Sequence, residues 1–390
     1  MNTKQIIFDS IQERIDAYMS LVKAMYENPE IGNEEFETMA LLCDYLENAG
    51  FMVERGYVVP TGFKAVYDTN KQGPTIAFMC EYDALPEVGH GCGHNLIAGI
   101  GVAAGEGLKQ VIDLYGGKVV VLGTPAEENF GGKVSMANAG VFDEFDAALM
   151  VHPDTKTGIG ARSQALNPVK FEFFGKNAHA CQPENGASAL DAAVMTFMQI
   201  NLLRQFVKPG TYIHGIIRDG GKAANVIPAY ASLEYYFRAD TMKYAKQITE
   251  RAVDCAKGAC LATNTEVKTS IYECPYEDTL INYTLADLLM DAYKELGIQE
   301  VEKVDEIANG STDVGAASYK CPTIQGTIKI AEPCVLGHSK EMAAATISEE
   351  GKQGLIKASS AIAIVALHLL EDPACLKTVK EEYKQSILNL

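Results

Sequence analysis

The first 50 residues of the chain carry apolar side chains at the three- and four-residue spacing of amphipathic helices. Two groups of apolar positions are interspersed with acidic residues, and Ala49-Gly50 ends the second helical stretch. The groups are Ile11, Ile15, Tyr18, Met19, Leu21 and Val22, then Met39, Leu41, Leu42 and Tyr45. We therefore expect two helices before the first strand.

Three short and uninterrupted apolar runs follow, at residues 75–80, 118–123 and 147–151. Runs of this length suit strands that are buried on both faces. Small apolar residues fill positions 99–108, between the first two runs, as in a helix that packs closely on a sheet. Strands that alternate with helices predict an α/β fold with a mixed, mostly parallel sheet.

The pattern changes after about residue 165. Strand-like and helical segments now follow one another in a β-α-β-β-α-β order, which is that of a ferredoxin-like α+β domain. The strands are expected at 169–174, 212–217, 231–238 and 265–272, and the helices at 187–207 and 245–260. This order predicts a self-contained small domain.

The helix–strand rhythm resumes near the end of the chain, with helices at 280–296 and 349–370 and a strand at 322–330. The simplest organisation is a discontinuous large domain into which the small one is inserted. The predicted boundaries are 1–165 and 278–390 for the large domain and 166–277 for the inserted domain.

Composition narrows the possible partners. The 390 residues include 33 Lys+Arg and 51 Asp+Glu, which gives a net charge of −18 and a pI near 4.9. Such acidity argues against binding to nucleic acid or to anionic membranes. We expect no segment to be long and apolar enough to span a membrane. The N-terminal residues turn polar too soon for a signal peptide, and ten scattered cysteines show no disulfide-like rhythm, so we expect a cytoplasmic protein.

Side chains that can bind metals follow the predicted strands of the large domain. They are Cys92 and His94 after the first, Glu127 and Glu128 after the second, His152 after the third, and His338 after the late strand. Taken singly, each is more ordinary as a buried thiol, a solvated acid or a loop histidine. Three of only seven histidines at strand ends of one sheet favour a metal site instead.

Two other functions compete with a metal-dependent hydrolase. Cys92 with a histidine base could form a cysteine nucleophile, which would tolerate chelators but not thiol alkylation. Alternatively, the fold could bind peptides without turning them over.

Several motifs occur in order along nearly the whole chain: Glu-Tyr-Asp-Ala-Leu-Pro, Gly-His-Gly-Cys-Gly-His-Asn, Thr-Pro-Ala-Glu-Glu, Gly-Lys-Asn-Ala-His-Ala, Ala-Asn-Val-Ile-Pro, Gly-Ser-Thr-Asp-Val-Gly and Gly-His-Ser. By these the chain resembles the aminoacylase/carboxypeptidase superfamily of dinuclear zinc peptidases. It is most similar to the amidohydrolase branch with aminobenzoyl-glutamate hydrolase, auxin-conjugate amidohydrolases and related dipeptidases.

The resemblance implies roles for residues of the large domain. Glu127 matches the general base that activates the attacking water, and Asp83 matches an acid that orients a ligand. The metal ligands implied are Cys92, His94, Glu128, His152 and His338. Glu81 stands where peptidase branches carry a histidine ligand and has no assigned role, and Asn95 replaces an acid that many relatives carry.

The resemblance also implies roles in and beside the inserted domain, which would act as a lid and a dimerisation domain. His179 matches a histidine that polarises the scissile carbonyl, in relatives often from the partner subunit. Asn225 and Arg238 match positions that hold the substrate's carbonyl or carboxylate. A pocket-lining backbone loop is matched by Gly310, Ser311 and Thr312.

The expected enzyme is a metal-dependent amidohydrolase or peptidase. It would cleave N-acyl amino acids, aminoacyl-glutamate-type conjugates or dipeptides that carry a free carboxylate. We expect two divalent ions, zinc in the first instance because of the thiolate ligand, with manganese or cobalt as alternatives. A homodimer, or a higher homo-oligomer formed through the lid domain, is implied by the resemblance alone.

Overall fold

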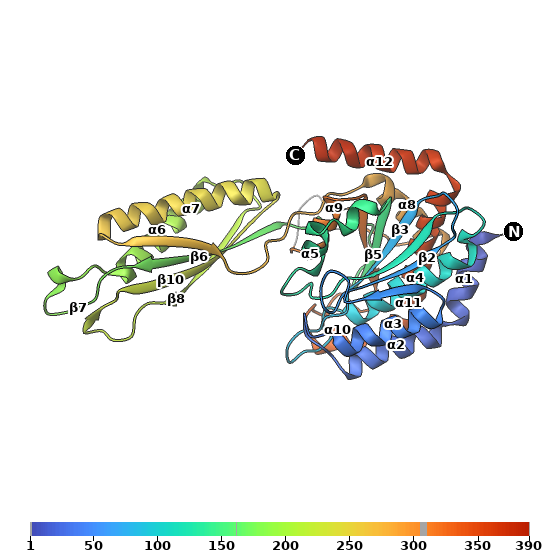
Figure 1. Cartoon of the computed structure of the whole chain (residues 1–390), viewed down its shortest axis with the longest axis horizontal. Coiled ribbons are helices and arrows are strands. Elements are labelled where there is room, and N and C mark those ends of the chain that lie inside the picture. Colours follow the sequence, from blue (N-terminus) through green and yellow to red (C-terminus); the bar gives the residue numbers. More distant parts are fainter. Residues whose placement is uncertain (1, 161, 305–309, 390) are drawn as a thin grey trace. The chain divides into compact units, whose positions relative to one another are not determined.

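A computed structural model describes residues 2–160, 162–304 and 310–389. The described residues fall into two compact units. The large unit comprises residues from Met1–Arg162, Thr279–Glu306 and Asp313–Leu390, and the small unit comprises Ser163–Asp278 with the short segment that ends at Thr312 (Figure 1). The domain boundaries predicted from the sequence run close to this division.

The large unit is built on one six-stranded mixed sheet with the order β1-β2-β4-β3-β5-β12. β3, β4, β5 and β12 run parallel to one another, whereas β2 pairs antiparallel with β4, and β1 pairs antiparallel with β2 at the edge of the sheet. The strands are β1 (Met52–Arg55), β2 (Phe63–Asp68), β3 (Thr75–Cys80), β4 (Lys118–Gly123), β5 (Ala147–Asp154) and β12 (Thr323–Lys329). The mixed, mostly parallel α/β sheet is confirmed.

Helices cover both faces of this sheet. The core on one face is formed largely by α1, α2, α4, α8 and α11, and the core on the other by α5, η1 and α9. The bounds are α1 (Thr3–Glu13), α2 (Ile15–Glu27), α3 (Phe36–Asn48), α4 (His94–Ile112), α5 (Gly132–Asn138), η1 (Val141–Glu144), α8 (Tyr283–Glu295), α9 (Val314–Ser318), α10 (Lys340–Ala345), α11 (Glu349–Glu371) and α12 (Pro373–Leu388).

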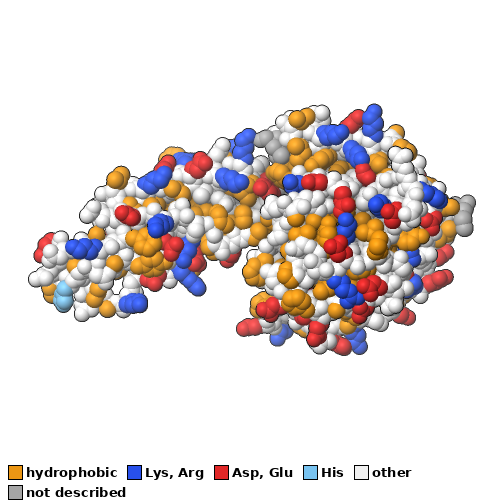
Figure 2. Space-filling model, viewed as in Figure 1, with side chains coloured by type: hydrophobic (Ala, Val, Ile, Leu, Met, Phe, Trp, Pro, Cys, Tyr) orange, Lys and Arg blue, Asp and Glu red, His pale blue; other side chains and the backbone are white. Residues whose placement is uncertain are grey.

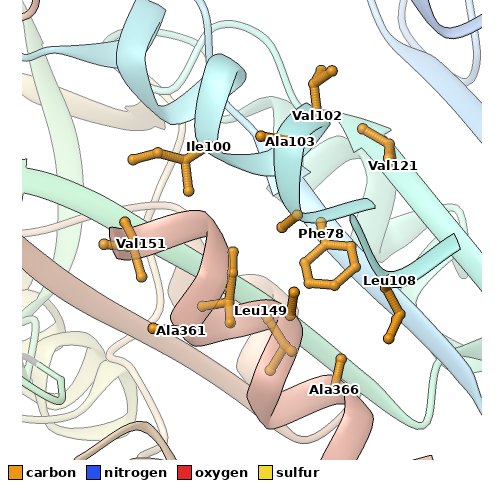
Figure 3. Close-up of a cluster of buried hydrophobic side chains, with 14 of the residues drawn as sticks. Phe78, Ile100, Val102, Ala103, Leu108, Val121, Leu149, Val151, Ala361 and Ala366 are labelled. Atoms are coloured by element: carbon orange, nitrogen blue, oxygen red, sulfur yellow. The ribbon is translucent and has the colours of Figure 1, made fainter. Parts of the chain in front are cut away.

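The two-faced burial of β3 explains its uninterrupted apolar sequence. Ile76 and Phe78 belong to the core under α4 and α11, while Ala77 and Met79 belong to the opposite core. Figure 3 shows Phe78 among side chains of both helices and of neighbouring strands. In α4, a Cβ on Gly105 would lie 2.3 Å from Val121, so glycine is what allows this helix to lie so close to the sheet.

α11 corrects one expectation from the sequence. By length and composition it is apolar enough to cross a membrane, although no segment was expected to be. Its apolar window is 83% buried inside the large unit, and α11 packs against α4 and α8. Burial in the core therefore accounts for its composition.

The small unit contains a four-stranded antiparallel sheet with the order β11-β6-β10-β8, together with the short β7–β9 pair. Its β-α-β-β-α-β succession and strand order are ferredoxin-like. α6 and α7 pack on each other and on this sheet. The bounds are β6 (Ala165–Phe174), β7 (Ala178–His179), α6 (Ala189–Leu203), β8 (Tyr212–Asp219), β9 (Val226–Ile227), β10 (Tyr230–Ala239), α7 (Met242–Thr263) and β11 (Glu266–Ile271).

Candidate metal centre

The predicted ligands of the large unit converge at the carboxyl ends of β3, β4 and β5. Asp83 lies just beyond β3, and His94 is the first residue of α4. The preceding Gly93 has a φ of 85°, and a Cβ there would lie 2.4 Å from Pro153. Only glycine therefore lets the Cys92–His94 segment approach the end of β5, where His152 stands.

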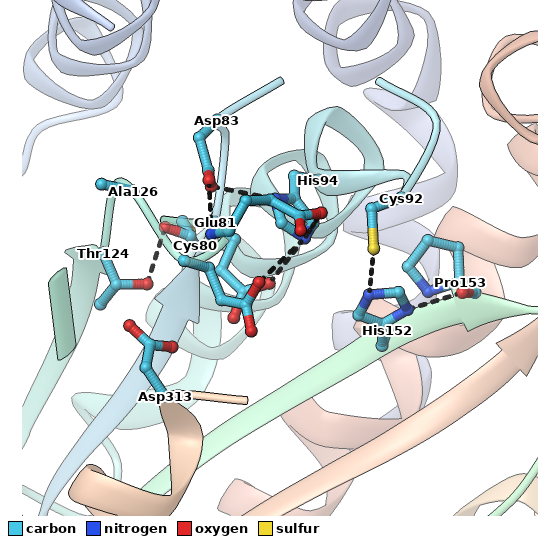
Figure 4. Close-up of polar contacts among 12 residues, drawn as sticks. Cys80, Glu81, Asp83, Cys92, His94, Thr124, Ala126, His152, Pro153 and Asp313 are labelled. Carbon is cyan, nitrogen blue, oxygen red and sulfur yellow. Dashed lines mark hydrogen bonds and ion pairs between the residues drawn. The ribbon is translucent and has the colours of Figure 1, made fainter. Parts of the chain in front are cut away.

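The separations of these side chains suit shared metal ions. Two donors about 2.1 Å from one tetrahedral ion lie about 3.4 Å apart, and a sulfur donor at about 2.3 Å widens this to about 3.6 Å. Cys92 Sγ lies 3.5 Å from His152 Nε2, and His338 Nε2 lies 3.5 Å from Glu128 Oε1 (the first pair in Figure 4). The donors are therefore already at ligand spacing.

The side chains form overlapping groups whose donor atoms all lie within 4.8 Å of one another. One group contains Cys92, His94 and His152, and another contains Cys92, Glu128 and His338. His94 Nε2 and Glu128 Oε1 are buried without a hydrogen-bond partner. Because unsatisfied buried polar atoms cost free energy, these two atoms fit the places of metal ligands, and Cys92 is common to both groups.

Hydrogen bonds orient the ligand side chains toward the centre. His94 Nδ1 donates to Asp83 Oδ1 at 2.9 Å, and the Glu128 amide donates to Asp83 Oδ2 at 2.9 Å. His152 Nδ1 donates to the carbonyl of Pro153 at 2.7 Å (Figure 4). Each histidine thus keeps Nε2 for the centre, which is how neighbouring acceptors commonly fix metal-binding histidines.

The turn that carries the two glutamates is strained. Ala126, just before them, has a φ of 61°, in the left-handed region that alanine rarely adopts. The buried carboxylate of Glu35 accepts from the Ala126 amide and from Thr61 Oγ1, both at 2.8 Å. Burial raises the pKa of Glu35 to about 7. Sequence reasoning missed Glu35, because its partners lie far along the chain.

His338 lies on a loop after β12 and is the most exposed of the predicted ligands, with a side chain 57% accessible. Its φ of 58° is also left-handed, and its amide donates to the carbonyl of Gly91 at 2.9 Å. That bond ties the His338 loop to the segment that carries Cys92.

In the absence of metal, burial or neighbouring charges raise the pKa values of three side chains of the centre. Burial would lower the pKa of His94, but Asp83, Cys92 and Glu81 raise it well above its usual value. Burial raises the pKa of the Cys92 thiol to about 12. Burial, then Glu81 and Asp313, raise the pKa of Glu127 well above that of a free glutamate. A proton on His94 and one on Cys92 therefore compete with any cation.

Other residues near the centre have structural contacts. The Asn95 amide donates to the Val22 carbonyl and to Thr346 Oγ1, so its side chain is turned toward α2 and the end of α10. His90 is buried, and neither ring nitrogen has a hydrogen-bond partner. Lys133 and Asp313, which sequence reasoning did not single out, form a buried ion pair beside Glu81.

The predicted site residues of the small unit fall into two groups. His179 pairs with Val226 in the β7–β9 ladder, and the carbonyl of Asn225 accepts from the Ala180 amide. Arg238 Nη1 donates to Ser311 Oγ at 2.7 Å. Thr312 follows Ser311, and Gly310, with a φ of 64°, accepts through its carbonyl from the Gln164 amide.

These two groups lie at opposite ends of one sheet. β10 pairs with β6 from Tyr230 opposite Phe174 to Arg238 opposite Leu166, and β7 and β9 adjoin the Tyr230 end. Eight residues of strand span about 27 Å. A small ligand held by Arg238 therefore cannot touch His179 of the same small unit. The roles of all these side chains stay predictions.

Comparison with known proteins identifies the family. The model of Peptidase family M20/M25/M40 matches residues 67–366. The chain is 36% identical to Xaa-Arg dipeptidase of Mus musculus, over 96% of this chain and 91% of the relative. It is 28% identical to one of the subunits of p-aminobenzoyl-glutamate hydrolase from Escherichia coli (strain K12), over 98% of this chain and 95% of that relative.

Solved structures show the same fold. An aminobenzoyl-glutamate utilization protein from Klebsiella pneumoniae aligns with a TM-score of 0.71 at 20% identity, over 92% of this chain and 97% of that one. The YXEP protein of Bacillus subtilis, described as a dinuclear metal-binding peptidase, aligns with a TM-score of 0.66 at 18% identity, over 92% and 99%. The chain belongs to Peptidase family M20/M25/M40 and is a metal-dependent hydrolase of peptide or amide bonds.

Proposed function

We propose that the enzyme uses two divalent ions, zinc in the first instance, with Cys92 shared between them. His94 and His152 would complete one ligand group, and Glu128 and His338 the other. The observation that supports this most directly is the membership of Cys92 in both groups of closely spaced donors. Thiolate and imidazole ligands favour zinc, while the carboxylate leaves manganese and cobalt as alternatives.

Glu127 is the proposed general base. It precedes Glu128 in the strained turn and lies within the third group of closely spaced donors, with His94 and Glu128. Bound metal ions polarise the scissile carbonyl and lower the pKa of the attacking water. Glu127 takes the proton from that water and returns it to the leaving nitrogen, which needs a carboxylate whose pKa lies near the working pH.

The small unit is proposed to hold the rest of the substrate. Arg238, with Ser311 beside it, suits a substrate carboxylate because a guanidinium binds carboxylates through paired hydrogen bonds. His179 suits the carbonyl oxygen, which gains negative charge during attack. The separation of about 27 Å within one small unit means that both contacts on one small substrate require His179 from a second copy of the chain.

A homodimer through the small unit follows as a proposal. Val194, Met198 and Leu202 recur every four residues on α6 and are exposed. β8 also carries two exposed apolar side chains, Ile216 and Ile217. β8 is an edge strand of its sheet, and unpaired edges readily pair with another chain. Figure 2 shows hydrophobic side chains interspersed with charged ones over the small unit.

The proposed substrates are dipeptides or N-acyl amino acids that carry a free carboxylate, hydrolysed in the cytoplasm. The relatives support this breadth, since one is named a dipeptidase and another a hydrolase of aminobenzoyl-glutamate. An Xaa-Arg dipeptide is the first candidate because that relative is the more similar of the two.

A hydrolysis panel tests the function. Xaa-Arg dipeptides, N-acetyl amino acids and aminobenzoyl-glutamate are offered to purified protein, to chelator-treated protein and to treated protein with Zn²⁺, Mn²⁺ or Co²⁺ restored. We expect turnover of at least one substrate, loss with the chelator and recovery with metal. Activity that survives chelation but not thiol alkylation would support a Cys92 nucleophile instead.

A further inference from the structure

The buried lysine of α5 has no part in the mechanism above. Lys133 is 0% exposed, and its Nζ lies 2.6 Å from both Glu81 Oε1 and Asp313 Oδ1. Its amide also donates to Asp313 Oδ2 at 2.9 Å. Because a buried charge is costly, a lysine held here by two acids needs an explanation.

Glu81 connects this lysine to the metal centre. While its Oε1 accepts from Lys133, its Oε2 lies 3.4 Å from His94 Nε2, the nitrogen that Asp83 leaves free. The nearest oxygens of Glu128 and Glu127 are farther from this nitrogen, at 3.9 and 4.0 Å. Oxygen and nitrogen about 3.4 Å apart have the spacing of neighbours around one ion.

A purely structural role would explain only half of this arrangement. Asp313 directly precedes α9 and accepts hydrogen bonds from the amide and the ammonium of Lys133, so these two residues alone would join α9 to α5. The second carboxylate adds no contact between those helices. Glu81 instead follows β3 and places negative charge on the metal side of His94.

We propose that Lys133 is a positioning residue of the metal centre that acts through Glu81. Lys133 holds one carboxylate oxygen so that the other stays beside His94 Nε2, where it attracts and orients the cation bound by His94. Asp313 in turn fixes Lys133. This inference rests on the proposed metal centre, but it concerns affinity for the ion rather than turnover.

Glu81→Gln tests the idea with little threat to folding. Glutamine keeps the shape, and the Lys133–Asp313 pair still neutralises itself. In a competition between protein and a chelating dye for Co²⁺, without substrate, we expect binding of one of the two ions to weaken at least tenfold. The visible absorption of the remaining Co²⁺ should change in wavelength or intensity. Unchanged affinity and spectrum would overturn the proposal.

Lys133→Met and the double variant test whether Lys133 acts through Glu81. Lys133→Met should weaken binding of the same ion at least tenfold. Combining Lys133→Met with Glu81→Gln should cause no further loss of Co²⁺ affinity. If the affinity losses of the two single variants add up in the double variant, Lys133 does not act through Glu81. If Lys133→Met does not fold, Asp313→Asn replaces it, with the same expectation for the pair.

A matched control is Lys109→Met on α4, since Lys109 donates to the Ala49 carbonyl and contacts no acid of the centre in that bond. It should leave Co²⁺ affinity unchanged. If the protein binds both ions yet hydrolyses no substrate, the proposed function is wrong. The comparison of Co²⁺ affinities still tests the role of Lys133 in that case.

Discussion

The two units carry their predicted site residues in opposite ways. In the large unit, the side chains of Asp83, His94 and Glu127 are buried at strand ends, and neighbours hold the first two by hydrogen bonds. In the small unit, His179 and Asn225 lie on exposed segments. The contrast indicates a centre whose side chains are held in place before substrate arrives, whereas the proposed substrate contacts of the small unit depend on what later covers them.

The largest effect is expected in the buried centre, from Glu127→Gln. Removal of the proposed general base should lower kcat by about 10³-fold or more, within or above the usual range for acid–base catalysis. Metal content by elemental analysis should stay at the wild-type value, because glutamine replaces a group that is not a proposed ligand. Activity close to wild type would falsify the assignment.

Cys92→Ala is expected to have the second-largest effect. Since Cys92 belongs to both donor groups, its loss should reduce the occupancy of both ions together and lower activity by about 10²-fold or more. Cys321→Ala is the control, because Cys321 is a buried thiol in the core that α5, η1 and α9 form with the sheet. Loss of one ion alone would show that Cys92 serves a single metal.

His179→Ala tests the small unit. Loss of one donor to the developing oxyanion should lower kcat by about 10²-fold and leave metal content unchanged. His368→Ala, on α11 of the large unit, is the control and should have little effect. Equal effects of both variants would contradict the role of His179.

The pH dependence of metal binding sharpens the comparison further. In the metal-free centre the raised pKa of His94 and that of Cys92, about 12, keep both groups protonated at neutral pH. A bound metal requires both to be deprotonated, so affinity should rise with pH and fall as pH is lowered. Calorimetry at pH 7 in buffers of different ionisation enthalpy should show net proton release. No release would contradict this account.

The smallest effect on the folding of the single chain is expected from Met198→Glu on α6. A charge on this exposed apolar row should shift the protein toward monomer in analytical ultracentrifugation, with little loss of folding stability, since the side chain is 64% exposed. Leu114→Glu, exposed in the large unit, is the control. An unchanged dimer would place the interface elsewhere.

The sequence predicted most strands of both units, because buried and half-buried strands have distinct apolar patterns. β3 and β4 have the predicted bounds, at 75–80 and 118–123. The first helical stretch is two helices, since Arg14 separates α1 from α2. The edge strand β1, its neighbour β2 and the polar helix α12 were not predicted, because few of their residues are buried.

The centre was partly predictable for a similar reason. Cys92, His94 and the glutamates stand next to strongly apolar strands, so their place in the sheet could be inferred. Glu35, Lys133 and Asp313 could not, since a buried acid or lysine looks like a surface residue until its partner is known. Only the fold brings Lys133 to Glu81, 52 positions earlier in the chain.

A Co²⁺ titration of the metal-free protein tests the shared thiolate most directly. The near-ultraviolet absorption of the thiolate–cobalt bond is followed as ions are added. Because Cys92 is proposed to contact both ions, this absorption should grow or change through two equivalents and be missing in Cys92→Ala. A signal that is complete at one equivalent, or that persists in Cys92→Ala, would contradict a dinuclear centre built around Cys92.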